Sequence, residues 1–160
     1  MLTDFQKSPP DVFALPVINQ APTDVLRVFV FGLGDMSGEL GLGPNIKSAP
    51  LPVPIPKVDG REEGNYRIVQ IACGGMHAIA LTLDGKIVTW GGNDEGALGR
   101  DTTWEGGVRD MDAEAGDSDG GGSGSEEEAL DPLESTPTLV PESSFPAGTK
   151  FTSLGHVQGR

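Results

Sequence analysis

The sequence predicts an all-β fold assembled from small antiparallel sheets of the kind that form the blades of a β-propeller. Three observations support this prediction. The chain contains 24 Gly and 13 Pro among 160 residues, which disfavours long helices because both residue types are costly in a helix interior. Residues 67–90 contain three short apolar segments separated by turns. A strand followed by a glycine-rich loop occurs twice along the chain.

The first predicted strand lies at 28–31, where the run Val-Phe-Val-Phe combines β-branched and aromatic residues. Gly32 follows it directly, and a loop rich in further glycines extends to Gly43. Residues 1–24 contain several prolines and no sustained hydrophobic period. We therefore expect an extended N-terminal arm at 1–24.

A β-meander is predicted at 67–90. Residues 67–73, 77–83 and 86–90 each have the composition of a short strand, with a glycine-rich turn at 74–76 between the first two. Asp84-Gly85 joins the second strand to the third. This dipeptide predicts a type I′ turn, which needs a positive φ at both central residues.

The internal repeat is the observation that indicates a propeller. The segment Val30-Phe31-Gly32 with the later Gly38-Glu39-Leu40-Gly41 is repeated as Thr89-Trp90-Gly91 with Gly96-Ala97-Leu98-Gly99. A weaker repeat pairs residues 51–54 with 138–141, and the strand that begins at Ile68 with residues 151–154. We assign residues 25–109 to the first propeller repeat or repeats, and residues 135–160 to the start of the next repeat, which is truncated.

The acidity of the chain is concentrated in one segment. The formal net charge is −13, and residues 110–134 carry ten of the 24 carboxylates with no Lys or Arg. We expect 110–134 to be a disordered, self-repelling insert. Its start resembles a calcium-binding loop, but Ala115 stands where that loop requires Gly. No metal, cofactor or direct nucleic-acid site is predicted, since no Lys/Arg cluster occurs elsewhere.

Residue content also limits the function classes. Cys73 is the only cysteine, which favours a reducing compartment. Neither a signal peptide nor an apolar run of about 18 residues is found, so we expect a soluble intracellular protein without a membrane partner. With two His, one Cys and no Gly-x-Ser-x-Gly motif, no catalytic constellation is predicted.

Three consecutive segments resemble the repeat of the regulator of chromosome condensation family. They are 74–82 (GGMHAIALT), 84–91 (DGKIVTWG) and 93–102 (NDEGALGRDT). The run 104–107 (WEGG), followed by the acidic insert and by 133–137 (LESTP), is similar to fungal members in particular. The resemblance implies a seven-bladed propeller, of which this chain holds about one to two blades as an N-terminal fragment.

The resemblance also implies a function. Intact family members promote guanine-nucleotide exchange on the small GTPase Ran by stabilising its nucleotide-free form, which is binding rather than enzymatic chemistry. Nuclear localisation and, in the full-length protein, contact with chromatin through histones are further expectations, although no basic import signal is visible in this chain. The alternative is a propeller scaffold for protein interactions without exchange activity.

Four acidic residues are the candidates for partner contact, because the resemblance places their loops on the face that meets Ran. These are Asp35, Glu39, Asp94 and Glu95. The alternative is that the carboxylates cap turns. The structural positions of the repeat are Gly32, Gly41, Gly74, Gly75, His77, Gly91 and Gly99. The glycines are expected to adopt positive φ or to allow close packing, and His77 is expected to be a core histidine bonded to a neighbouring blade.

Overall fold

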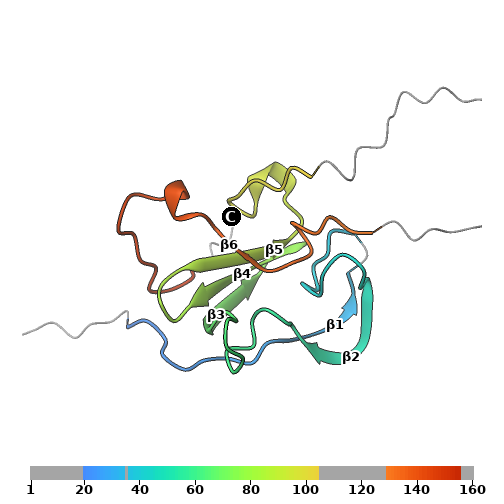
Figure 1. Ribbon diagram of the computed structural model, residues 1–160, viewed down its shortest axis with the longest axis horizontal. Coiled ribbons are helices and arrows are strands. Elements are labelled where there is room, and N and C mark those ends of the chain that lie inside the picture. The colour runs from blue at the N-terminus through green and yellow to red at the C-terminus, as the bar shows by residue number, and fades with distance from the viewer. Residues whose placement is uncertain (1–19, 35, 105–128, 156–160) are drawn as a thin grey trace, which may run out of the picture.

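The computed structural model describes residues 20–34, 36–104 and 129–155, which form two open antiparallel sheets (Figure 1). The strands are β1 (Phe29–Leu33), β2 (Ser48–Pro54), β3 (Ile68–Cys73), β4 (His77–Thr82), β5 (Ile87–Gly91) and β6 (Thr138–Leu139), with short 3₁₀ segments η1 (Asp94–Gly96) and η3 (Glu142–Ser144). The larger sheet has the order β3-β4-β5-β6, and the smaller sheet pairs β1 with β2. No helix in these ranges is long and apolar enough to cross a lipid bilayer. The predicted all-β class is confirmed.

All four predicted strands are present within two residues of their expected bounds. β5 is buried at every position, and β4 is buried or half-buried throughout. A strand covered on both faces does not need alternating polar residues. This burial explains why 77–83 and 86–90 are apolar rather than alternating.

The turn between β4 and β5 differs from the predicted type I′ turn. The amide of Gly85 donates to the carbonyl oxygen of Thr82 at 2.9 Å, and Gly85 has a φ of 78°. Asp84 does not share this conformation, because Glu95 is the one non-glycine residue with positive φ in the described ranges. The connection is therefore a three-residue loop with a single left-handed glycine at its end.

The side chain of Thr82 favours this longer loop. Its hydroxyl donates to Asp84 Oδ1 at 2.6 Å and accepts from the backbone amide of Lys86 at 2.9 Å. The bond from Lys86 satisfies a backbone amide that the longer loop removes from the pairing of β4 with β5. An Asp-Gly dipeptide suits both loop types, so the dipeptide alone did not distinguish them.

β6 completes the sheet that the meander begins. Val88 pairs with Leu139 and Thr89 with Thr138, so part of the segment assigned to the next repeat lies beside β5. β1 and β2 pair in the same antiparallel way, and β1–β2 corresponds to β5–β6 in the repeated sequence. Residues 1–19, 105–128 and 156–160 lie outside the described residues, and the predicted arm, insert and repeat boundaries stay predictions.

Two apolar clusters lie on opposite faces of the larger sheet. Side chains alternate between the faces of a strand, so Ala78 and Ala80 of β4 enter one cluster and Leu81 enters the other. The first cluster includes Ile55, Val58, Ile68, Val88 and Trp90, with Val28 and Val30 packed against it. The second includes Val69, Ile87 and Val140, with Phe145, Phe151 and Leu154 packed against it. The larger sheet is thus covered from one side by the β1–β2 unit and from the other by residues 145–154.

Candidate partner-binding surface

Three segments meet where β5 ends: the first glycine loop (residues 32–43), the second glycine loop (residues 91–99) and residues 131–136. Together we call them the glycine-loop surface. The amide of Gly91 donates to the carbonyl of Glu134 at 2.9 Å, and the amide of Gly43 donates to the carbonyl of Ser135 at 3.0 Å. A Cβ added to Gly92 would lie 3.2 Å from the Ser37 hydroxyl oxygen. The two glycine loops are therefore in direct contact.

Trp90 fixes the first glycine loop to the larger sheet. Its side chain is only 1% exposed, and its indole Nε1 donates to the carbonyl of Glu39 at 3.1 Å. A Cβ on Gly41 would lie 2.8 Å from the indole Cδ1, and a Cβ on Gly38 would collide with Ser135. Both glycines are therefore needed for close packing as well as for their positive φ.

The backbone of the first glycine loop is repeated in the second. Equivalent glycines have matching positive φ values: Gly32 110° and Gly91 97°, Gly38 71° and Gly96 79°, Gly41 67° and Gly99 65°. The leucines between the last two glycines, Leu40 and Leu98, are both buried. The positive φ expected at Gly32, Gly41, Gly91 and Gly99 is thus observed.

The aromatic residues at the two strand ends differ in burial. Phe31 is 69% exposed, whereas Trp90 is 1% exposed. The difference has a simple cause, because Trp90 covers the glycine loop that precedes it, and no glycine loop precedes Phe31 in the described part of the chain. The two strand ends are therefore equivalent in backbone conformation, but the surroundings of Phe31 and Trp90 differ.

Asn93 and Arg100 hold the second glycine loop in shape. Asn93 Oδ1 accepts from the amide of Leu98 at 2.9 Å, and its Nδ2 donates to the carbonyl of Arg100 at 3.2 Å and to Thr102 Oγ1 at 2.9 Å. Arg100 donates to Thr89 Oγ1 at 3.1 Å and to the carbonyl of Leu133 at 2.7 Å. Sequence analysis did not assign these roles. The available signal was Asn93 itself, a short polar residue two positions after the end of β5.

The candidate acidic residues lie on this surface where they are described. Asp94 and Glu95 are exposed in η1, and Glu95 has φ 53° and ψ 25°. Glu39 is half-buried, and its carboxylate accepts from the amide of Ser37 at 3.4 Å. Asp35 lies outside the described residues. Because Ser37 contacts Gly92, Glu39 and the η1 carboxylates belong to adjoining loops.

Glu134 is a further carboxylate on this surface that sequence analysis did not single out. Partial burial raises its pKa above the ordinary value, and the nearby charges of Asp131 and Asp94 act in the same direction. A hydrogen bond from Thr102 Oγ1, at 3.3 Å, opposes the shift. Glu134 therefore adds a third carboxylate beside Asp131 and Asp94 on this surface.

His77 is the first residue of β4 and pairs with Gly91 at the end of β5. Its ring packs over Gly74, since a Cβ there would be 2.6 Å from the imidazole Cε1. The side chain is half-buried, and it has no hydrogen bond to another described residue. Gly75 borders open space. No group of three or more His, Cys, Asp and Glu side chains in the described ranges could hold a metal ion.

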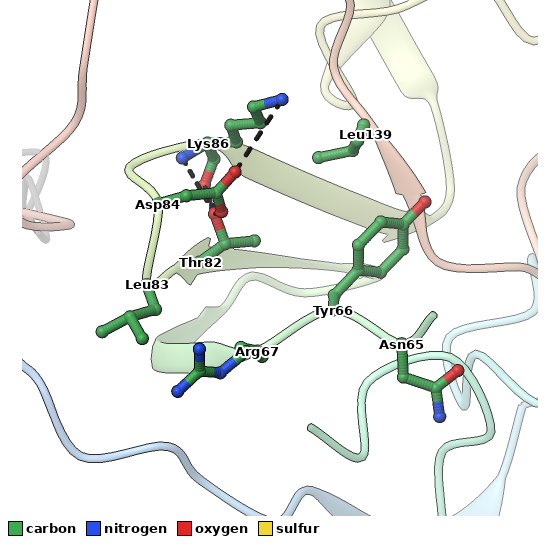
Figure 2. Close-up of a pocket in the computed structure, with 8 residues that line it drawn as sticks. All are labelled: Asn65, Tyr66, Arg67, Thr82, Leu83, Asp84, Lys86 and Leu139. Atoms are coloured by element: carbon green, nitrogen blue, oxygen red, sulfur yellow. Dashed lines mark hydrogen bonds and ion pairs between the residues drawn. The ribbon is translucent and has the colours of Figure 1, made fainter. Parts of the chain in front are cut away.

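A pocket of about 480 Å³ lies at the other end of β5, beside the β4–β5 turn. Figure 2 shows Asp84 and Lys86 at its rim and the ring of Tyr66 facing Leu139. Lys86 Nζ lies 3.8 Å from Asp84 Oδ2 and 3.1 Å from Glu142 Oε1. The carboxylate of Glu142 accounts for most of the rise in the pKa of Lys86. Lys86 and Asp84 of this pocket are thus already in ion pairs, whereas the glycine-loop surface carries the candidate acidic residues, so the glycine-loop surface is the better candidate.

Comparison with known proteins gives two matches to a repeat family. A model of the regulator of chromosome condensation (RCC1) repeat matches residues 27–81, and a second model of this repeat matches residues 68–97. Together these ranges include both glycine loops up to Ala97.

Individual proteins show the same similarity. The chain is 41% identical over 123 residues to the guanine nucleotide exchange factor SRM1 of Saccharomyces cerevisiae, covering 76% of this chain and 24% of SRM1. It is 45% identical over 93 residues to protein RCC1 of Candida albicans, covering 55% and 20%. The crystal structure of Prp20p from Saccharomyces cerevisiae, described with its binding properties to Gsp1p and histones, matches with a TM-score of 0.56 and 35% identity over 79% of this chain and 23% of that chain. The chain spans less than a quarter of the length of these relatives.

Proposed function

Because the chain carries repeats of the regulator of chromosome condensation family, we propose that it is part of a β-propeller guanine-nucleotide exchange factor for a Ran-type small GTPase. The observation that supports this most strongly is the 41% identity to an exchange factor over 76% of the chain. The seven-bladed ring of the intact protein would supply the rest of the binding surface.

The proposed activity needs binding alone. An exchange factor that binds the nucleotide-free GTPase more tightly than the nucleotide-bound form shifts the equilibrium toward nucleotide release. The glycine-loop surface offers Glu39, Asp94 and Glu95 for such binding. A surface of this charge favours a partner that presents Lys or Arg, and it accelerates their encounter at low salt.

A chimera tests the proposal. The 123 matched residues of SRM1 would be replaced by the equivalent part of this chain, and release of a fluorescent guanine nucleotide from a Ran-type GTPase would be measured by stopped flow. We expect the chimera to accelerate release many-fold over the GTPase alone. The double variant Asp94→Lys/Glu95→Lys should slow release about tenfold or more, since close charge pairs contribute about 1.5 kcal/mol or more each.

The matched control is Glu62→Lys/Glu63→Lys, which makes the same charge change at exposed positions away from the glycine loops. It should leave release unchanged apart from a small salt-dependent effect. A folded chimera that does not accelerate release would favour the alternative function, a propeller scaffold for protein interactions without exchange activity.

Localisation and chromatin contact follow from the same proposal. A protein of this family would act in the nucleus, and contact with histones would belong to the full-length protein. The binding of Prp20p to histones supports this assignment. The acidic character of the described loops gives no support to direct binding of nucleic acid, because phosphates require Lys and Arg.

A further inference from the structure

Glu134 ties together the two ends of the second glycine loop. Its backbone carbonyl accepts from the amide of Gly91, where the loop begins, at 2.9 Å. Its carboxylate accepts from the hydroxyl of Thr102, shortly after the loop, at 3.3 Å, although 32 positions separate these two residues in sequence. One residue from a distant segment therefore restrains the loop from both sides.

The bond from Thr102 to Glu134 ends a chain of hydrogen bonds that reaches into the second glycine loop. Asn93 Oδ1 accepts from the buried amide of Leu98, so its Nδ2 is the group that donates to Thr102 Oγ1, at 2.9 Å. While its oxygen accepts from Asn93, the Thr102 hydroxyl donates its own hydrogen to Glu134. An ionised carboxylate can only accept, so Glu134 matches the direction of the whole chain.

The backbone of the loop needs such a restraint. Glu95 has φ 53° and Gly96 has φ 79°, so two consecutive residues are left-handed. This region is unfavourable for a non-glycine residue, and it persists only where the surroundings determine it. Asp94 and Glu95 are exposed, so packing of their own side chains does not hold the conformation. The hydrogen bonds of Asn93 supply the restraint, with Glu134 at their end.

The interactions of the Glu134 carboxylate point into this network. Glu134 is half-buried, whereas Asp94 and Glu95 are exposed. Partial burial raises the pKa of Glu134, and the charges of Asp131 and Asp94 add to the rise. Burial lowers the pKa of the half-buried Arg100, and the charge of Glu134 opposes that shift. Glu134 thus compensates a charge inside the site, while Asp94 and Glu95 face solvent.

We propose that Glu134 is a positioning residue for partner binding, which holds the second glycine loop in the conformation that presents Asp94 and Glu95 to the GTPase. The inference rests on the proposed function, in which these two carboxylates contact the partner. Glu134 itself does not contact the partner. Loss of its carboxylate would release Thr102 and, through it, the side chain of Asn93. The binding-competent conformation of the loop would then be populated less, and the apparent affinity for the partner would fall by the same fraction.

Two substitutions at position 134 distinguish positioning from direct contact. Glu134→Ala removes the acceptor for Thr102. Glu134→Gln keeps an acceptor oxygen but removes the charge, so it should recover most of what Glu134→Ala loses. A carboxylate that met a Lys or Arg of the partner would require the charge, and Gln would then be as harmful as Ala. The matched control is Glu63→Ala, which removes a carboxylate at an exposed position away from the glycine loops.

Nucleotide release from a Ran-type GTPase, promoted by the SRM1 chimera that carries each variant, is the first test. Glu134→Ala should slow release about three- to thirtyfold, as is typical of residues that modulate a site without touching its ligand. In an Asp94→Ala/Glu95→Ala background it should slow release less than about twofold, because the residues that it positions are absent. Glu63→Ala should leave release unchanged.

Two outcomes of this test would overturn the proposal. The first is equal slowing by Glu134→Ala in both backgrounds, because the loss of a separate contact, or a general loss of folded protein, is additive. The second is a Glu134→Gln variant as slow as Glu134→Ala, because the charge and not the acceptor would then be what the partner requires.

Hydrogen–deuterium exchange of the same chimeras, followed by mass spectrometry, measures the opening of the loop without the GTPase. Peptides that include residues 93–98 should exchange faster in Glu134→Ala by a factor similar to the slowing of release, and should be unchanged in Glu134→Gln and Glu63→Ala. Unchanged exchange in Glu134→Ala would overturn the proposal even if release slows. An unmodified chimera that fails to accelerate release contradicts the proposed function instead, and hydrogen exchange then still decides whether Glu134 holds the loop.

Discussion

Trp90 lies directly over Gly41, although 48 residues separate the two in sequence. The indole Cδ1 would be 2.8 Å from a Cβ at position 41, and the indole Nε1 donates to the carbonyl of Glu39. This contact joins the β1–β2 unit to the larger sheet. Because it depends on the absence of a side chain, it makes a direct prediction about stability.

Gly41→Ala should destabilise the chain by about 2–4 kcal/mol, since it combines an unfavourable positive φ with a collision against a buried indole. The change would be measured by urea unfolding followed by Trp fluorescence. Gly43→Ala is the control, because Gly43 has φ 94° and no atom within 4 Å of an added Cβ. It should cost only about 1–2 kcal/mol. Equal losses for the two variants would contradict the packing role of Gly41.

Glu95→Asn should stabilise the chain by about 0.5–1 kcal/mol. Glu95 has φ 53°, which is unfavourable for most side chains but is tolerated by Asn. The same variant removes a charge proposed to meet the partner, so the chimera that carries it should gain stability and lose exchange rate. Glu63→Asn, at an exposed position without positive φ, should change neither by a comparable amount. A loss of stability in Glu95→Asn would contradict this reading of the backbone.

Asn93→Ala should loosen the second glycine loop. The substitution removes three hydrogen bonds and leaves the amide of Leu98, a residue that is 0% exposed, without its partner. We expect a loss of about 2–3 kcal/mol. Hydrogen exchange measured by NMR should accelerate at the Leu98 amide. Unchanged protection of that amide would show that Asn93 does not hold the loop.

Glu134→Gln should change the pH dependence of stability. The folded-state pKa of Glu134 is raised, which means that folding disfavours the charged carboxylate. Below the unfolded-state pKa of about 4.3 the carboxyl group is neutral in both states, so it costs no stability there. As the pH rises through the folded-state pKa, the unmodified chain loses stability relative to the Gln variant. The difference in urea midpoint between the two proteins should therefore grow from pH 4 to pH 7, with the Gln variant more stable.

Asp101→Asn provides a control of opposite sign. Hydrogen bonds from Thr103 lower the pKa of Asp101, so its contribution is present above the unfolded-state pKa and is lost as the pH falls through the folded-state pKa. The Asn variant should be less stable than the unmodified chain at pH 7 and should approach it in acid. Parallel pH profiles for the two variants would contradict both assignments.

The strands and the repeated loops were predictable because their signals are local. Apolar runs bounded by glycines located β1 and β3 to β5, and the repeated Gly-x-Leu-Gly motif predicted the matching φ values at Gly41 and Gly99. The sequence itself placed the candidate acidic residues on these loops, and the resemblance to the repeat family added the prediction that these loops meet the partner. The family matches confirm that resemblance.

What the sequence did not reveal depends on contacts between distant segments. The loop at Asp84-Gly85 is set by the hydroxyl of Thr82 rather than by the dipeptide. The raised pKa of Glu134 arises mainly from its partial burial in the fold, with a contribution from the charge of Asp131. The unequal burial of Phe31 and Trp90 depends on whether a glycine loop lies against the aromatic ring, and the similar sequences of the two strand ends do not specify that.

The affinity of the SRM1 chimera for a Ran-type GTPase tests the central claim most directly. Dissociation constants would be measured by calorimetry for the nucleotide-free GTPase and for the nucleotide-bound form. We expect the nucleotide-free form to bind at least a hundredfold more tightly, about 2.7 kcal/mol, with a smaller difference in the Asp94→Lys/Glu95→Lys variant. Equal affinity for the two forms would contradict the account, because a protein that binds both equally cannot promote exchange.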